Sequence, residues 1–195
     1  VKAYGVLVPA IARPREEGGY ELVAGHRRHR ASLLAGLAEM PVIVREMDDD
    51  EATIIMVDSN LQRETLLPSE RAFAYRMKLE ALKHQGERRD LTSCQVGRKL
   101  RADEKMAASV NESARTIQRF IRLTYLVPPF LDMVDEHKVA FNPAVELSYL
   151  TSEEQVALLD AMDSEQSTPS LSQAQRLKKF SQEGRLSEDV MRAIL

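Results

Sequence analysis

The chain has 195 residues, of which 44% are hydrophobic and 29% charged, and this balance excludes wholesale disorder and a fibrous repeat. The length allows one large domain or two small ones. A single cysteine, Cys94, excludes an internal disulfide, and no apolar run is long enough to cross a bilayer. The composition therefore predicts a soluble cytoplasmic protein. Because the chain begins without methionine, we also expect residues to be missing upstream.

The net charge of -3 is unevenly distributed along the chain. Residues 1–84 carry 12 basic and 13 acidic side chains, residues 85–125 carry 9 and 5, and residues 126–195 carry 6 and 12. A basic middle segment inside an acidic chain predicts a local contact with a polyanion.

The first 47 residues favour a small α/β unit. Glycine and proline separate short β-prone runs, which cover residues 5–8, 11–13, 20–23 and 41–45. Between the last two runs, apolar residues at helical spacing predict a helix over residues 28–37.

Beyond Met47 the sequence predicts only helices. An acidic run at residues 48–50 marks a helix start, and Pro68 suits the first turn of a long helix that ends at a charged break over residues 86–90. A serine-rich linker is expected over residues 163–170. Shorter helices are expected at about 91–100, 103–109, 113–125, 129–137, 142–149, 152–162, 170–182 and 187–194.

The first candidate site lies between a predicted strand and the helix that follows it. It consists of Gly25, His26, Arg27, Arg28, His29 and Arg30. Free backbone N–H groups at a helix start and arginine forks both bind phosphate, so this pattern predicts a phosphorylated ligand. A solvated basic helix start is the structural alternative. The two histidines lack a partner pair for zinc, and metal ligation by them is set aside.

The second candidate site lies at residues 58–64, at the end of a predicted helix. Asp58 and Asn60 offer oxygen ligands for Mg²⁺, and Arg63 adds positive charge. The structural alternative is a helix C-terminal cap, because asparagine tolerates the left-handed conformation found there.

The third candidate site has the spacing of a helix-turn-helix, with a turn at Asn111 and Glu112 between two short helices. The second helix has one apolar and one basic face by the 3.6-residue period. Arginine and glutamine read base edges in the major groove. The candidate DNA contacts are Ser113, Arg115, Thr116, Gln118, Arg119 and Arg122. A solvated basic face remains the alternative, as it does for Arg176, Lys178 and Lys179 near the end of the chain.

Together these blocks resemble the ParB family of chromosome and plasmid partition proteins. Residues 5–9 resemble the family's GVLQP block, residues 25–30 its GERRxR motif and residues 60–63 its ENxxR motif, in the family's order. The resemblance implies an α+β fold. A small N-terminal α/β ParB-like nucleotide-binding domain would cover residues 1–66. An all-helical DNA-binding domain with a helix-turn-helix near 103–125 would follow over 67–163, and C-terminal helices would cover 164–195.

The resemblance implies a sequence-specific DNA-binding partition protein with a CTP-type nucleotide switch. Its target would be a centromere-like palindrome in double-stranded DNA, its cofactors CTP and Mg²⁺, and its partners a ParA-type ATPase and a second copy of the chain. It would associate with the nucleoid or a plasmid, and not with a membrane. The implied nucleotide site comprises Gly5, Val6, Gly25, His26, Arg27, Arg28, Arg30, Asn60, Gln62 and Arg63, with Asn60 as the metal ligand.

Three departures from the family pattern qualify this expectation. Val8 stands where the family has glutamine, which puts base selectivity in doubt, and His26 and Ser59 replace the two familiar glutamates. We therefore expect CTP binding with weak or absent hydrolysis, unless Asp58 or Glu64 takes over. The alternatives are a transcriptional regulator or nucleoid occlusion-like DNA binder, and a phosphate-site enzyme such as a kinase or nuclease.

Overall fold

The computed structural model describes residues 5–63, 65–90, 102–110 and 112–195. The chain forms two compact units. The N-terminal unit comprises Val1–Glu64 and Met77–Arg98, and the C-terminal unit comprises Thr65–Arg76 and Lys99–Leu195. The helix α3, Pro68–Asp90, is thus shared between them.

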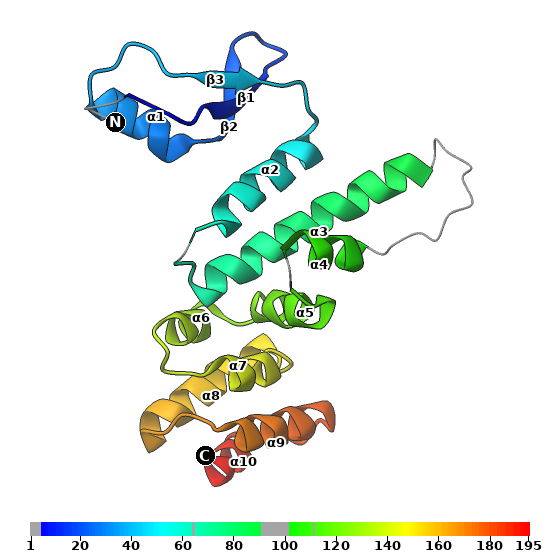
Figure 1. The fold of residues 1–195 in the computed structure, drawn as a ribbon. Helices are drawn as coiled ribbons and strands as arrows, with labels where there is room; N and C mark the ends of the chain where they lie inside the picture. Colours follow the sequence, from blue (N-terminus) through cyan, green and yellow to red (C-terminus); the bar gives the residue numbers. More distant parts are fainter. Residues whose placement is uncertain (1–4, 64, 91–101, 111) are drawn as a thin grey trace. The chain divides into compact units, whose positions relative to one another are not determined.

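The N-terminal unit is built on a three-stranded sheet in which β1 is central (Figure 1). This strand, Ala10–Pro14, runs antiparallel to β2, Tyr20–Ala24, and parallel to β3, Val42–Val44. The helix α1, His26–Leu34, lies between β2 and β3 in the chain, and α2, Asp49–Leu61, follows β3. The expected small α/β unit is confirmed.

The prediction of a strand over residues 5–8 is wrong. These residues are irregular, because Gly5 has a positive φ of 68° and the carbonyl of Val8 is bound by an arginine side chain instead of a neighbouring strand. The predicted helix over 28–37 begins and ends earlier, at His26 and Leu34. It stops there because Gly36, at φ 71°, allows the N–H of Leu37 to bond back to Ser32.

The acidic helix start is confirmed, since the side chain of Asp48 caps α2 by accepting the N–H of Glu51 at 2.8 Å. The predicted break over residues 86–90 is wrong, because α3 continues to Asp90. One glycine inside a helix costs only about 1 kcal/mol relative to alanine, which a long helix tolerates. The helix expected over 91–100 lies outside the described residues.

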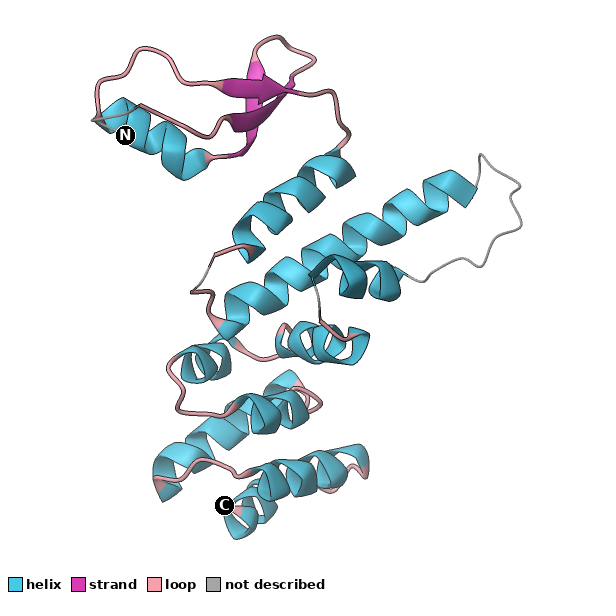
Figure 2. Cartoon of the chain, viewed as in Figure 1, coloured by secondary structure: helices cyan, strands magenta, loops and turns pink. Residues whose placement is uncertain are grey.

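The described residues of the C-terminal unit are helical and contain no strand (Figure 2). After the first part of α3, its helices are α4 Ala102–Val110, α5 Ala114–Leu123, α6 Pro128–Asp135, α7 Phe141–Leu147, α8 Ser152–Glu165, α9 Leu171–Gln182 and α10 Glu188–Ile194. The expected helices over this part of the chain are confirmed, with ends shifted by a few residues. The α+β fold class is confirmed with them.

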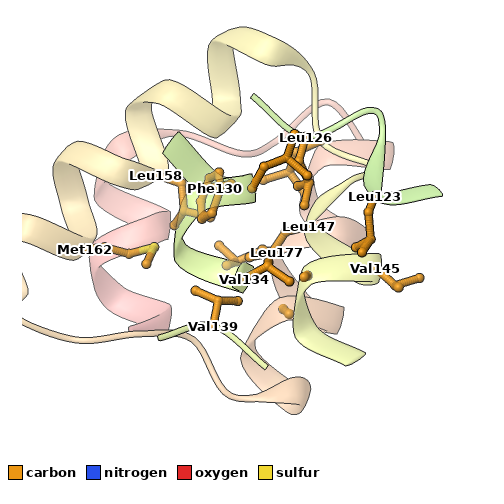
Figure 3. Packing of buried hydrophobic residues seen from close by; sticks show 14 of the residues in the cluster. Leu123, Leu126, Phe130, Val134, Val139, Val145, Leu147, Leu158, Met162 and Leu177 are labelled. Carbon is orange, nitrogen blue, oxygen red and sulfur yellow. The ribbon is translucent and has the colours of Figure 1, made fainter. Parts of the chain in front are cut away.

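One hydrophobic core joins the helices of the C-terminal unit (Figure 3). Phe130, Leu147 and Leu158 are fully buried in it, and the last two helices add Leu177 and Met191. The linker predicted over 163–170 is shorter in the structure, since α8 continues to Glu165 and α9 begins after its N-cap, Ser170. None of the described helices is both long and apolar enough to cross a membrane.

Candidate phosphate site and the surface of α5

Two of the sequence motifs meet at one cavity of about 180 Å³ in the N-terminal unit. The end of β2 and the first turn of α1 form one side, and the last turns of α2 form the other. Its lining consists of Val23, Ala24, Gly25, His26, Arg27, Arg28, Met56, Ser59, Asn60 and Arg63. The structure therefore brings together residues that are more than 30 positions apart. Of the predicted nucleotide-site residues, Gly5, Val6, Arg30 and Gln62 do not line this cavity.

Gly25 occupies a position at which no other residue fits without strain. Its φ is +106°, and an added Cβ would lie 2.8 Å from the Cβ of Ala10 and 3.3 Å from Nη2 of Arg28. As the N-cap of α1 it offers no side chain to the helix, and the first turn of α1 carries no acidic residue. The first N–H groups of α1 are thus without an intrahelical acceptor and suit an anion.

The three arginines of the cavity differ in their contacts. Nη1 of Arg28 donates to the carbonyl oxygens of Val8 and Pro9, at 2.6 Å each. Arg27 and Arg63 are exposed, and within the described residues their side chains make neither an ion pair nor a hydrogen bond. Two guanidinium groups are therefore uncommitted at the cavity, and one is committed to the loop before β1.

Asn60 and Ser59 are the neutral polar groups that α2 contributes to the cavity. Within the described residues no three His, Cys, Asp or Glu side chains cluster as metal ligands. A single carboxamide fits a Mg²⁺ ion that takes its other ligands from phosphate and water, which is the usual way proteins hold this ion. Asp58 does not line the cavity. Its carboxylate lies 2.5 Å from the ammonium of Lys78, which is only 2% exposed.

The α5 helix has the predicted apolar and basic faces. Ser113 caps it by accepting the N–H of Thr116 at 3.0 Å, and Ile117 is fully buried. Arg115 and Gln118 are exposed, and within the described residues neither side chain has a hydrogen-bonding partner. These two side chains are free to meet a ligand. Asn111, in the predicted turn, lies outside the described residues.

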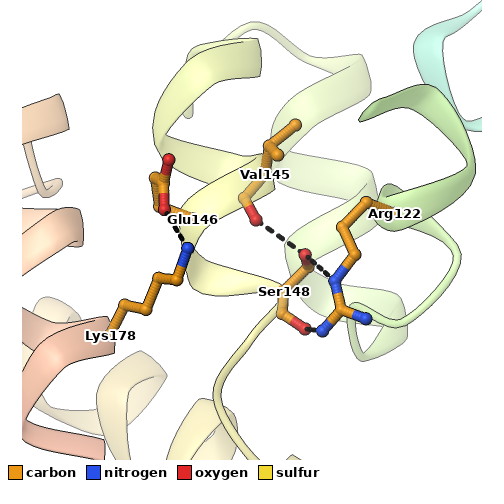
Figure 4. Close-up of polar contacts among 5 residues, drawn as sticks. All are labelled: Arg122, Val145, Glu146, Ser148 and Lys178. Carbon is orange, nitrogen blue, oxygen red and sulfur yellow. Dashed lines mark hydrogen bonds and ion pairs between the residues drawn. The ribbon is translucent and has the colours of Figure 1, made fainter. Parts of the chain in front are cut away.

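The other two predicted contacts on α5 are committed to α7. Arg119 donates to Oδ1 of Asn142 and lies over the ring of Phe141. Arg122 donates to the hydroxyl of Ser148 at 3.1 Å and to its carbonyl at 2.6 Å (Figure 4). These arginines therefore fix the position of α5.

Near the end of the chain, Lys178 likewise has partners within its own unit. Its ammonium lies 2.9 Å from the carboxylate of Glu146 (Figure 4) and 3.7 Å from the ring centroid of Tyr149. Arg176 and Lys179 are exposed on the same helix.

A buried group behind the α4–α5 turn escaped the sequence analysis. Burial raises the pKa of Tyr75 to about 12, and the neighbouring Glu112 carboxylate raises it further toward that value. Arg71 lies 3.4 Å from Glu112 and stacks over Phe120, whose ring also meets Tyr75 edge-on. The four-residue spacing of Arg71 and Tyr75, with the acid in the turn, was the available signal.

Comparison with known proteins supports the motif assignments. Residues 1–61 match the ParB N-terminal domain family. Over 144 residues the chain is 38% identical to the probable chromosome 1-partitioning protein ParB of Deinococcus radiodurans, covering 74% of this chain and 43% of that protein. Over 164 residues it is 33% identical to the nucleoid occlusion protein of Listeria innocua, covering 84% and 52%. The chain spans about half the length of these curated relatives.

A solved structure extends the similarity across both units. It is the C-terminally truncated chromosome-partitioning protein ParB of Caulobacter crescentus, complexed to the centromeric parS site. The two share 26% identity and superpose with a TM-score of 0.52, over 96% of this chain and 81% of that one. With the phosphate cavity, the order of the motifs and the helical unit in agreement, the chain belongs to the ParB family.

Proposed function

We propose that this chain is the nucleotide- and DNA-binding part of a partition protein that recognises a centromere-like palindrome under the control of CTP. The observation that carries the proposal is the cavity at which the Gly25 and Asn60 motifs meet, beside two uncommitted arginines. The relatives supply the biological setting, because they include chromosome-partitioning proteins and one that was solved on its centromeric site.

In this proposal the cavity holds the phosphates of the nucleotide. Its volume of about 180 Å³ is below the roughly 300 Å³ at which pockets for whole small molecules begin, so the base lies outside it. Arg27 and Arg63 take the phosphate charge with the first N–H groups of α1. Asn60 would hold Mg²⁺, and the ion would supply neutralisation of neighbouring phosphate oxygens.

Hydrolysis is expected to be weak or absent. Among the described residues no carboxylate lines the cavity, and the Asp58 carboxylate is held by Lys78. A water molecule at the phosphates thus has no carboxylate to orient it. The same observation removes support for a kinase or nuclease acting through this site. Glu64 lies outside the described residues.

The DNA-binding half is proposed to use α4 and α5 as a helix-turn-helix. Arg115 and Gln118 would read base edges, while Arg119 and Arg122 hold α5 in place. A palindrome presents two half-sites, so two copies of the chain would bind together. A ParA-type ATPase as the partner that moves the DNA is part of the same proposal.

A second candidate function is nucleoid occlusion. It is favoured by the similarity to the Listeria innocua protein, whose identity of 33% is close to the 38% of the partition protein. Mapping the chain on the genome by chromatin immunoprecipitation separates the two. Binding near the replication origin or on a plasmid supports partition, and sites spread around the chromosome support nucleoid occlusion.

Calorimetric titration of CTP, with ATP, GTP and UTP for comparison, tests the nucleotide proposal. The whole chain is used with Mg²⁺, with and without palindromic DNA. Arg63→Ala removes an uncommitted arginine of the cavity, and Arg45→Ala, an exposed arginine of the same unit outside it, is the matched control. We expect CTP-selective binding that Arg63→Ala weakens at least tenfold and Arg45→Ala leaves unchanged. No binding of any nucleotide to the wild type would refute the proposal.

A further inference from the structure

Arg28 connects the phosphate cavity to the loop that precedes β1. Its side chain lines the cavity, and its Nη1 donates to both Val8 and Pro9 at 2.6 Å. The other end of the guanidinium lies close to Gly25, where an added Cβ would come within 3.3 Å of Nη2. The group is therefore held from two sides, by two carbonyls and by the backbone of the α1 start.

A phosphate ligand does not need this guanidinium. Turning Arg28 toward phosphate would break two hydrogen bonds from a charged donor, which are stronger than bonds between neutral groups. Arg27 and Arg63 can bind phosphate without such a loss, because within the described residues their side chains have no partner. The contacts divide the arginines into two that suit phosphate and one that holds a loop.

The loop itself has only its backbone to offer a base. Leu7 and Val8 are exposed, at 82% and 63%, but their side chains carry no polar atom. Backbone groups can still distinguish bases, since a carbonyl accepts the amino group of cytosine and repels the oxygen that uracil carries at that position. Such selection works only if the backbone is fixed in place.

We propose that Arg28 is a positioning residue for base selection, which fixes the Val8 and Pro9 carbonyls and with them the loop that reads the base. The inference rests on the proposed nucleotide function and refines it. Arg28 then contributes to the choice between CTP and UTP, whereas Arg27 and Arg63 contribute to the binding of the phosphates. Val8 in place of the family's glutamine is compatible with selectivity, because the backbone and not this side chain makes the choice.

The test compares Arg28→Lys with Arg27→Lys in the whole chain, since both retain positive charge. A lysine ammonium cannot reproduce the planar fork that reaches two carbonyls. Affinities for CTP, UTP and CDP are measured with Mg²⁺, thermal unfolding checks the fold, and hydrogen exchange of the Leu7 and Val8 amides is followed without nucleotide.

For Arg28→Lys we expect the ratio of CTP to UTP affinity to fall about tenfold, with the ratio of CTP to CDP affinity unchanged and faster amide exchange in the loop. For Arg27→Lys we expect the reverse: a lower CTP to CDP ratio, an unchanged CTP to UTP ratio and unchanged loop exchange. A purely structural role of Arg28 would weaken all three nucleotides equally, and that result would overturn the inference.

The two proposals fail in different ways. A wild-type chain that binds no nucleotide would refute the proposed function and the base selection together. A wild type that prefers CTP, beside an Arg28→Lys variant with the same preference or the same loop exchange, would refute the inference alone.

Discussion

At the scale of single residues, Gly25 decides whether the phosphate cavity can form. Its backbone combines a φ of +106° with an approach to Ala10 that leaves no room for a side chain. The sequence shows that a glycine stands before a basic helix start. It does not show the second constraint, because Ala10 lies 15 residues away and reaches Gly25 only through the pairing of β1 with β2.

We expect Gly25→Ala to destabilise the N-terminal unit by about 2 kcal/mol or more, since the positive φ costs about 1–2 kcal/mol and the Ala10 contact adds overpacking. Gly36→Ala is the matched control. Gly36 also has a positive φ, of +71°, but a Cβ added there would meet no other atom within 4 Å. Urea unfolding measures both variants. Equal losses of stability in the two would contradict the role given to the Ala10 contact.

At the scale of elements, α5 separates residues that hold the helix from residues that are free to bind. Arg122 and Arg119 lie on its basic face with Arg115 and Gln118, so helical periodicity alone assigns all four to DNA. The separation depends on α7, which supplies Ser148 and Asn142 from more than 20 residues away. The sequence pattern predicts the face, and the packing determines the use of each residue.

We expect Arg115→Ala to weaken binding to a palindromic DNA at least fivefold while leaving the unfolding free energy within about 0.5 kcal/mol of the wild type. Arg122→Ala is expected to cost about 1–3 kcal/mol of stability, because the carbonyl of Ser148 loses a charged donor. Fluorescence anisotropy measures the first effect and urea unfolding the second. Stability loss in Arg115→Ala without weaker DNA binding would reverse these assignments.

The α4–α5 turn gives a second prediction at this scale, through Tyr75. Its pKa of about 12 in the folded chain lies above the usual value of 10, so the folded state holds the proton more tightly. The stabilisation is complete below pH 10 and is lost as the pH rises toward 12. We expect the wild type to lose more stability over this range than Tyr75→Phe, as measured by urea unfolding at several pH values. Parallel losses in both would show that Tyr75 has no such role.

At the scale of the whole molecule, the sequence predicts much of the architecture and less of the site. The strand and helix patterns give the two-part α+β organisation, because each rests on local periodicity. The irregular path of residues 5–8 and the continuation of α3 to Asp90 were missed, because each depends on contacts or tolerances beyond local pattern. The meeting of the Gly25 and Asn60 motifs was implied by family resemblance, and the structure gives its geometry.

Both units share α3, which contributes Pro68–Arg76 to one and continues in the other. A helix common to a nucleotide-binding and a DNA-binding unit is a physical route for linkage between the two ligands. Linkage is reciprocal, so DNA must change the affinity for CTP by the same factor by which CTP changes the affinity for DNA.

The central claim is a nucleotide switch in a DNA-binding chain, and the affinity for a palindromic duplex with and without CTP and Mg²⁺ tests it most directly. The account predicts that CTP changes the affinity of the wild type at least fivefold, that UTP does so less, and that Arg63→Ala abolishes the effect while binding DNA normally without nucleotide. The same affinity for DNA in the presence and absence of CTP, in a wild type shown to bind CTP, would contradict it.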